Sequence, residues 1–402
     1  MPEAVIVATG RTPIGRAFKG TMTECRPDDL SALVVEAVLN KLPQLDKTEI
    51  DDLMLGCGQP AGESGFNMAR VVAILSGLDN VPGVTVNRYC SSSLQTIRMA
   101  AHAIKAGEGD VFISAGVETV SRFGNGNSDG VPNTSNPKFA EAQLRSLDRS
   151  QGNGGDWKAP EGLPDVYIGM GNTAENVAEF QHISREEQDE FACLSQNRAT
   201  ASLERGFFER EIIPVTLADG TVISQDDGIR AGTTVEKLAQ LKPVFKPNGT
   251  VTAGNACPLN DGAAAVVVMS DIKAKSLGIK PLARIVASGV TGLNPEIMGL
   301  GPIEACKQAL KRAGMTIDDV DLVEINEAFA AQVIPSARAL NIDMDKLNVN
   351  GGAIALGHPF GMTGARIMTT LINGLEDADK TIGLESMCVG GGQGMAMIIE
   401  RL

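Results

Sequence analysis

The sequence predicts an α/β protein built from two similar halves, with a loop-rich segment inserted in the first half. Short apolar runs with the alternation of β-strands take turns with runs at helical spacing, the pattern of βαβ units with mostly parallel sheets. Four such runs near the start of the chain have counterparts, in the same order, near its end. Between them lies a stretch rich in Gly, Asn, Ser and Pro, which is typical of loops and turns.

The first half contains the four β-like runs in the order expected of consecutive βαβ units. They are AVIVATG at 4–10, IDDLMLG at 50–56, VTVN at 84–87 and DVFISAGVE at 110–118. A helix is expected after the third run, because apolar residues recur at three- and four-residue steps from Leu94 to Ile104.

The inserted segment has a different texture from the two halves. Residues 121–164 are predicted to form loops, a charged helical pattern follows at 172–205, and short strands are expected near Ile212 and Thr221. Buried strand character resumes at Val251. Inserted loops are a usual place for binding residues.

The second half repeats the four runs of the first. LARIVASGVTG at 282–292, VDLVEIN at 320–326, LNVN at 347–350 and KTIGLESMCVGGG at 380–392 match them in turn. We therefore expect a first half at 1–120 completed by about 251–280, a loop domain at 121–250, and a second half at 281–402.

The composition excludes several classes of function. The chain has 402 residues, a formal net charge of −14 and 4% aromatic residues, which argues against binding nucleic acid or a membrane surface. Its seven cysteines are dispersed without a CxxC pair, as in a reducing compartment. The N-terminus lacks a signal pattern and no apolar run has membrane-spanning length, so we expect a soluble, cytoplasmic protein.

The first candidate for chemistry is Cys90, in the stretch VTVNRYCSSSLQTI. It lies between a strand-like run and a helix, and Ser91 and Ser92 are residue types that cap helices well. A thiol at a helix N-terminus is expected to have a lowered pKa and to act as a nucleophile. The alternative is a small apolar residue packed where a helix meets a sheet.

Among the three histidines, His358 is the candidate base. It stands in NGGAIALGHPFGMTGAR, where the following proline disfavours a helix and the glycines permit close approach. The alternative is a glycine-rich turn whose histidine faces solvent. His102 is expected to be a surface or helix-packing residue, and His182 precedes a helix-capping pattern at Ser184.

Two further residues lie at strand ends. Cys388 precedes Gly390 and two more glycines, and exposed glycine N–H groups beside a thiol suit an oxyanion hole. Its alternative is a hairpin with a glycine-rich turn. Asn326 is predicted to end a strand and start a helix, where it could serve only as the N-cap. Two thiols, one loop histidine and one asparagine at strand ends together indicate an active site.

These motifs resemble those of the thiolase family over essentially the whole chain. They are NRYCSSSL, GMGNTAENVA, VTAGNACPLNDGAA, NEAFAAQ, NVNGGAIALGHPFGMTGAR and CVGGGQGMA. The resemblance implies two βαβαβαββ halves in a five-layer αβαβα sandwich with an inserted loop domain that binds coenzyme A (CoA). It also implies an acyl-CoA:acetyl-CoA C-acyltransferase that cleaves 3-ketoacyl-CoA by a ping-pong mechanism.

The resemblance assigns roles to the candidate residues. Cys90 would carry the acyl group as a thioester, His358 would activate it, and Cys388 would move the proton on the α-carbon of acetyl-CoA. Asn326 would hold a water in one oxyanion hole, shared with His358 Nε2. The N–H groups of Cys90 and Gly390 would form the second hole.

The resemblance also implies a CoA-binding set, with CoA as substrate and no permanently bound cofactor or metal. Arg230 matches the loop-domain arginine that meets the adenine nucleotide, with an ordinary charged loop residue as its alternative. The positions that match the pantetheine channel are Met170, Phe245, Ala253, Cys257 and Phe329. Acetyl-CoA, CoA and 3-ketoacyl-CoA are the expected partners, and a homodimer or homotetramer is the expected assembly.

Departures from the biosynthetic pattern favour a degradative enzyme of β-oxidation. Gly169 stands where many biosynthetic members have histidine, and Ser91 where they have a smaller residue. A biosynthetic acetoacetyl-CoA thiolase is the alternative. A decarboxylating condensing enzyme and a non-catalytic lipid carrier on the same fold are the other rivals, and the presence of both Cys90 and Cys388 argues against them.

Overall fold

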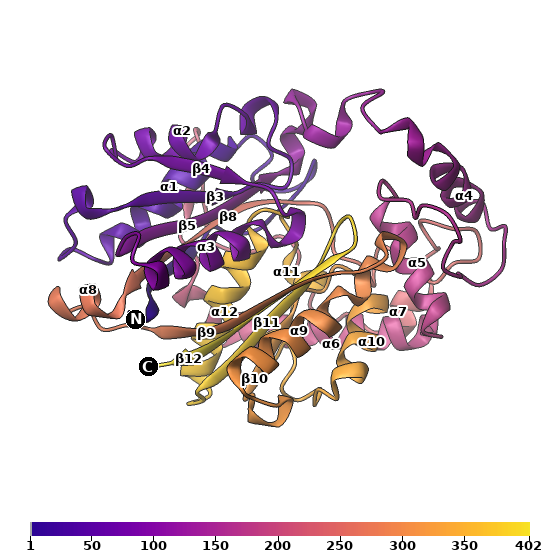
Figure 1. Cartoon of the computed structure of the whole chain (residues 1–402). Coiled ribbons are helices and arrows are strands. Elements are labelled where there is room, and N and C mark those ends of the chain that lie inside the picture. Colours follow the sequence, from indigo (N-terminus) through magenta and orange to yellow (C-terminus); the bar gives the residue numbers. More distant parts are fainter. Residues whose placement is uncertain (1) are drawn as a thin grey trace.

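The computed structural model describes residues 2–402, and its first half forms one end of a continuous sheet (Figure 1). The strand order there is β4-β3-β5-β8-β1. β3 runs parallel to β4 and β5, whereas β8 runs antiparallel to β5 and β1. The bounds are β1 Ala4–Arg11, β2 Gly15–Arg16, β3 Asp52–Gly56, β4 Gly83–Val86, β5 Val111–Thr119 and β8 Asn260–Ser270.

The second half has the same strand order. β10, β11, β12 and β9 follow one another, and β9 lies antiparallel to β1, so that the two halves meet along these equivalent strands. The expected strand at 347–350 is reduced to one bridge between Leu347 and Val323, which occupies the place of β4. The bounds are β9 Ala283–Gly292, β10 Leu322–Ile325, β11 Ile382–Val389 and β12 Gln393–Arg401.

Helices lie in three layers around the two halves of the sheet, which fits the five-layer α/β architecture that the thiolase resemblance implies. α1 and α2 cover the outer face of the first half, and α9 and α10 cover that of the second. α3 and α12 pack against each other between the halves (Figure 1). The bounds are α1 Pro27–Asn40, α2 Met68–Leu75, α3 Ser92–Ala106, α8 Asp271–Ser276, α9 Gly301–Ala313, α10 Ala330–Leu340, α11 Ala353–Leu356 and α12 Thr363–Asp377.

The inserted segment is more helical than predicted. α4 lies within the stretch expected to be loops, because AEAQLRSLDRS consists largely of good helix formers between the glycine-rich turns. The segment contains α4 Ala140–Ser150, α5 Met170–Phe180, α6 Arg185–Glu204 and α7 Val235–Ala239, with a small hairpin of β6 Val215–Thr216 and β7 Val222–Ile223. In Figure 1, α4 lies apart from the two sheets. The domain limits themselves stay predictions.

Strand β8 shows how the core joins the layers. All its residues are buried, and alternate side chains enter different apolar clusters, as the two-residue period of a strand requires. Val266 and Val268 face the central layer, whereas Val267 faces the outer helices α1 and α2. Burying each such side chain contributes roughly 1.5–3 kcal/mol. The central layer thereby becomes a rigid platform for residues at the strand ends.

Candidate active site

Cys90 lies on a tight 3-10 turn, Tyr89–Ser91, between β4 and α3. Tyr89 has φ +43°, a left-handed conformation that costs energy outside glycine and is often found at functional turns. The predicted position between strand and helix is confirmed, but the serines do not cap the helix. The Ser91 and Ser92 hydroxyls donate to backbone carbonyls of the turn, at Arg88 and Tyr89.

The structure corrects the expected acidity of Cys90. Burial raises the pKa of its thiol to about 12, and this outweighs the N–H groups of Gly390 and of Cys90 itself, which favour the thiolate. The sequence places the thiol at a helix start, but it does not show that the side chain is only 7% exposed. The resting side chain is therefore a neutral thiol.

His358 lies in the loop between α11 and α12, and it is buried instead of facing solvent. Its backbone N–H donates to Asn260 Oδ1 at 2.9 Å, and its ring meets Phe360 edge-on. Gly361 presses this loop against the sheet, since a Cβ there would lie 2.2 Å from the Val117 carbonyl oxygen. Burial, and then the nearby guanidinium of Arg366, lower the pKa of His358 to about 3, so the imidazole is neutral.

Hydrogen bonds select one tautomer of the neutral ring. Nδ1 lies 2.6 Å from Thr363 Oγ1, and that hydroxyl donates to the Pro359 carbonyl at 2.8 Å. Because a hydroxyl has one proton, Oγ1 accepts from Nδ1–H. Nε2 then has a free lone pair, consistent with the Asn326 amide group at 3.3 Å. The nitrogen that faces Asn326 is thus the basic one.

Asn326 does not cap a helix. It follows β10 as predicted, but α10 begins only at Ala330, because residues 326–329 are not helical. The Asn326 N–H donates to the Ser386 carbonyl, and Ala256 bridges to Phe329. Its side-chain Oδ1 is buried and has no hydrogen-bond partner among the described residues. An unpaired buried acceptor costs roughly 1–3 kcal/mol, so this oxygen is suited to hold a polar ligand or water.

Cys388 lies at the end of β11, one residue before the turn into β12. Gly391 and Gly392 make that turn in left-handed conformations, with φ +77° and +82°. Burial raises the pKa of the Cys388 thiol well above its usual value, and the Cys90 and Cys257 sulfurs are close enough to raise it further. The thiols of Cys90, Cys257 and Cys388 therefore lie in the same region of the molecule.

A cavity of about 570 Å³ opens onto Cys90. Its wall includes Cys90, Gly390 and Met170, together with Phe360 from the His358 loop. Most of the other lining residues belong to the inserted segment, and one of them, Asp129, is acidic. The cavity thus has the nucleophile candidate at its wall and the inserted segment as its cover.

The other predicted channel residues surround the same thiols. Met170, Cys257, Phe329 and Cys388 share one apolar cluster, and Phe245 packs edge-on against Phe329 with ring centroids 6.1 Å apart. Ala253 lies in the turn just after Thr252. Only Met170 of the predicted channel residues lines the cavity itself.

Arg230 lies at the surface, in a loop that packs against α11. The Gly228 Cα approaches the Ala355 carbonyl so closely that a Cβ would lie 2.2 Å from that oxygen. The Arg230 N–H donates to Gln196 Oε1, while its own side chain is exposed. The Arg230 side chain therefore lies at the protein surface, near α11, the short helix that precedes the His358 loop.

Glu118 is a site residue that the sequence did not reveal. It is the last residue of the buried run DVFISAGVE, where the sequence does not distinguish it from any other polar residue in a core strand. Its carboxylate accepts N–H bonds from Gly58 at 2.8 Å, Gln59 at 3.1 Å and Gly361 at 2.9 Å, so it fastens the His358 loop to the end of β3. Burial raises the pKa of Glu118 to about 7.

The described residues include neither a metal-binding cluster nor a membrane-spanning helix. Within residues 2–402, no three His, Cys, Asp or Glu side chains are grouped to hold a metal ion. No helix in the described chain is both long and apolar enough to cross a bilayer.

Comparison with known proteins agrees with this arrangement. The thiolase N-terminal domain matches residues 4–272, and the thiolase C-terminal domain matches residues 279–401. The 3-ketoacyl-CoA thiolases of Aeromonas hydrophila and Serratia proteamaculans are 44% and 46% identical, and a beta-ketoadipyl-CoA thiolase of Acinetobacter baylyi is 45% identical, each over 100% of both chains.

A solved structure shares the whole architecture. The acetyl-CoA acetyltransferase of Bacillus anthracis superposes with a TM-score of 0.86 at 39% sequence identity, covering 100% of this chain and 99% of that one. The two domain matches together span nearly the entire sequence. The chain is therefore an acyltransferase that belongs to the thiolase family.

Proposed function

We propose that the protein cleaves 3-ketoacyl-CoA with CoA, giving acetyl-CoA and a shortened acyl-CoA, through an acyl-cysteine at Cys90. One observation carries the proposal: the Cys90 sulfur lies at the wall of a large cavity, with the Gly390 N–H directed at it and the Cys388 thiol beside it. A hydrolase needs one thiol. A second thiol is useful when a proton must also be moved on carbon.

In the first half-reaction, the Cys90 thiol gives its proton to His358 Nε2 as its sulfur attacks the 3-keto carbonyl. The bond between C2 and C3 then breaks, the acyl group stays on Cys90 as a thioester, and the electron pair goes to the acetyl-CoA enolate. Cys388 donates its proton to that carbon. The developing enolate oxygen would meet His358 Nε2–H and a water held by Asn326 Oδ1.

In the second half-reaction, the CoA thiol gives its proton to the Cys388 thiolate and attacks the thioester. The tetrahedral oxyanion would accept hydrogen bonds from the backbone N–H groups of Cys90 and Gly390. Its collapse releases acyl-CoA, and His358 returns the proton to the Cys90 sulfur. Both thiols are then neutral again, which matches the raised pKa of each in the resting site.

The CoA substrate would enter along the inserted segment. Met170, Phe245, Ala253, Cys257 and Phe329 would line the pantetheine arm, since three of them share an apolar cluster with Cys388 and Phe245 packs against Phe329. The exposed Arg230 guanidinium would meet the adenine nucleotide at the mouth, where a phosphate can reach it without being desolvated.

The cavity favours an uncharged acyl chain longer than acetyl. Its volume of about 570 Å³ is within the range of ordinary ligand pockets, and it extends beyond Cys90 to Val131 and Tyr167 of the inserted segment. Its wall contains no lysine or arginine, and its one charged residue is Asp129. A dicarboxylic acyl group, such as the name of the Acinetobacter relative indicates, would place its second carboxylate there unpaired.

A rate series tests this function. Purified protein is mixed with CoA and 3-ketoacyl-CoAs of increasing chain length, and thioester products are followed by chromatography. We expect a maximum above the four-carbon substrate and an acyl mass on the Cys90 peptide that Cys90→Ser lacks. Activity confined to acetoacetyl-CoA would favour the biosynthetic alternative, and a label on another cysteine would remove Cys90 from the mechanism.

We also propose a cytoplasmic homodimer or homotetramer. All seven cysteines are free thiols, as in a reducing compartment. β4 ends the sheet and pairs with β3 alone among the described strands, and the nearby Phe66 is 95% exposed. Light scattering after gel filtration gives the mass, and a monomer at micromolar concentration would contradict the assembly.

A further inference from the structure

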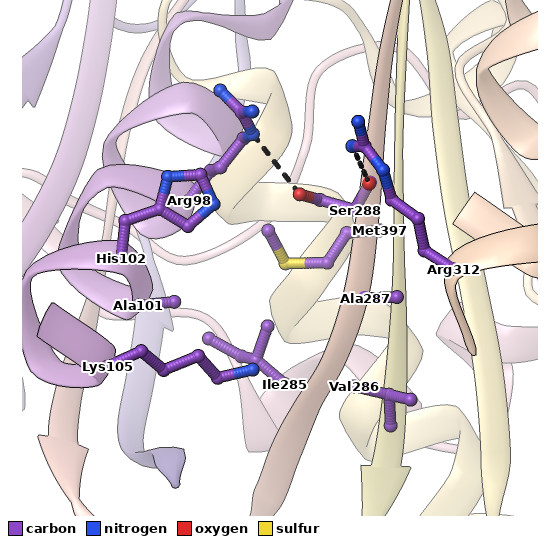
Figure 2. A pocket seen from close by; sticks show the side chains of 10 residues that line it. All are labelled: Arg98, Ala101, His102, Lys105, Ile285, Val286, Ala287, Ser288, Arg312 and Met397. Carbon is purple, nitrogen blue, oxygen red and sulfur yellow. Dashed lines mark hydrogen bonds between the residues drawn. The ribbon is translucent and has the colours of Figure 1, made fainter. Parts of the chain in front are cut away.

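A second cavity, away from the candidate active site, collects basic side chains. It has a volume of about 340 Å³ and lies between α3 and β9; we call it the α3–β9 groove. Figure 2 shows Arg98, His102 and Lys105 of α3 on one side and Arg312 of α9 on the other. It shares no residue with the cavity at Cys90.

The positive charge in this groove is not neutralised by its own wall. None of the ten lining residues is acidic, although the chain as a whole carries a net charge of −14. Arg98 Nε donates to the Ser288 hydroxyl at 3.2 Å, and an Arg312 nitrogen donates to the Ser288 carbonyl at 2.7 Å. Both guanidinium groups are thus anchored by neutral oxygens and keep further donors free.

The cations also act on one another. Burial and then the charge of Arg312 lower the pKa of Arg98, and Arg88 adds to the effect. Burial lowers the pKa of His102, with further contributions from Arg98, Lys105 and Arg312. Like charges held together in this way create a local positive potential that a bound anion would relieve.

The floor of the groove has a different character. Ala101, Ile285, Val286, Ala287 and Met397 present apolar surface beneath the cations (Figure 2). A volume of about 340 Å³ is at the lower end of small-molecule pockets. The ligand should therefore combine a compact apolar or sugar body with an anionic head.

We propose that the α3–β9 groove binds a small organic phosphate. Three permanent cations, Arg98, Lys105 and Arg312, match a group that carries about two negative charges better than a single carboxylate. Arginine presents paired N–H donors that fit phosphate oxygens, and Lys105 adds a point charge. The body of the ligand rests on Ile285 and Met397.

Calorimetry with the full-length protein tests the proposal. The probes are inorganic pyrophosphate, glycerol 3-phosphate and AMP, with acetate as the single-charge comparison. We expect saturable binding of the phosphates, weakened by added salt, and at least about a tenfold loss of affinity in Arg98→Gln/Arg312→Gln. Lys275→Gln/Lys280→Gln removes the same charge from exposed positions outside the groove and should change affinity less than about twofold.

Two more variants keep the test decisive. Arg230→Gln alters the proposed CoA site, and phosphate binding should persist in it. If the double arginine variant fails to fold, His102→Gln/Lys105→Gln leaves both bonds to Ser288 intact and should still weaken binding. Affinity unchanged in the groove variants would overturn the proposal, as would no saturable binding at millimolar probe. A loss of oligomer mass without phosphate binding would mean that a second copy occupies the groove, which also overturns it.

Discussion

His358 should make the protein less stable as the pH falls below neutral. Its pKa is lowered from 6.5 to about 3 by burial, so the folded protein holds a neutral ring while the unfolded chain takes up a proton. The stability contributed by the neutral ring is fully present above pH 6.5, and it is lost as the pH falls from there towards 3.

The size of the effect follows from the shift. One pKa unit corresponds to ~1.4 kcal/mol, so the whole shift is worth ~5 kcal/mol once the pH reaches the folded value. Between pH 7.5 and pH 5, the unfolded imidazole goes from mostly neutral to almost fully protonated. His358 should therefore account for ~2 kcal/mol of the stability lost in that interval.

Urea unfolding of the wild type and of His358→Gln at the two pH values measures this contribution. The variant should lose ~2 kcal/mol less between pH 7.5 and 5, whatever its absolute stability. His182→Asn is the matched control, because asparagine tolerates the left-handed φ of +53° at that position, and it should follow the wild type.

If wild type and His358→Gln lose the same free energy of unfolding between pH 7.5 and 5, within ~0.5 kcal/mol, the buried neutral ring is not a main cause of the pH dependence, and the argument is refuted. A second measurement does not depend on unfolding the protein. The chain has three histidines, so their ring protons can be assigned by NMR, and the His358 resonance should not titrate between pH 7.5 and 5. A titration near pH 6.5 would likewise refute it.

Three further predictions concern the other groups of the site. Cys388→Ala should still be acylated at Cys90 but should lose ~10²–10⁴-fold in deuterium exchange into the acetyl-CoA methyl group, and exchange at the wild-type rate would mean another acid–base group. Between pH 5.5 and 8.5, Glu118→Gln should lose ~2 kcal/mol less free energy of unfolding than the wild type. The reason is that a carboxyl whose pKa is raised to about 7 stabilises the fold below pH 4.5 and loses that contribution as the pH rises through 7. Alkylation of Cys90 by iodoacetamide should keep rising with pH beyond 9 and should be slower in His358→Ala near neutrality; a plateau by pH 7 would contradict the raised thiol pKa.

The fold could be predicted because its information is local and repeated. Each strand has its own two-residue alternation, and the equivalent strand in the other half repeats it. The prediction of β1 therefore strengthens that of β9, and the prediction of β3 that of β10. The errors occurred where local preference and packing disagree. LNVN has strand-like alternation but forms one bridge, at Leu347, and α4 forms between turns that resemble an unbroken loop.

The candidate site residues could be named from the sequence, but their arrangement could not. The motifs place His358 and Asn326 in separate loops, and only the folded chain brings the ring to 3.3 Å from the amide. Glu118 could not be found, because a carboxylate within DVFISAGVE looks the same whether it faces water or three N–H donors. The pKa of Cys90 was predicted in the wrong direction, since a helix start is visible in sequence and burial is not.

The pKa shifts of Cys90 and His358 have a consequence for the proposed chemistry. Burial raises the pKa of the Cys90 thiol and lowers the pKa of the His358 imidazole, so both shifts oppose moving the proton from Cys90 to His358 in the empty site. The thiolate is therefore not a resting species in this site. Proton transfer must accompany attack on the substrate, when the negative charge passes from sulfur to an oxygen that the fixed N–H groups of Cys90 and Gly390 can stabilise.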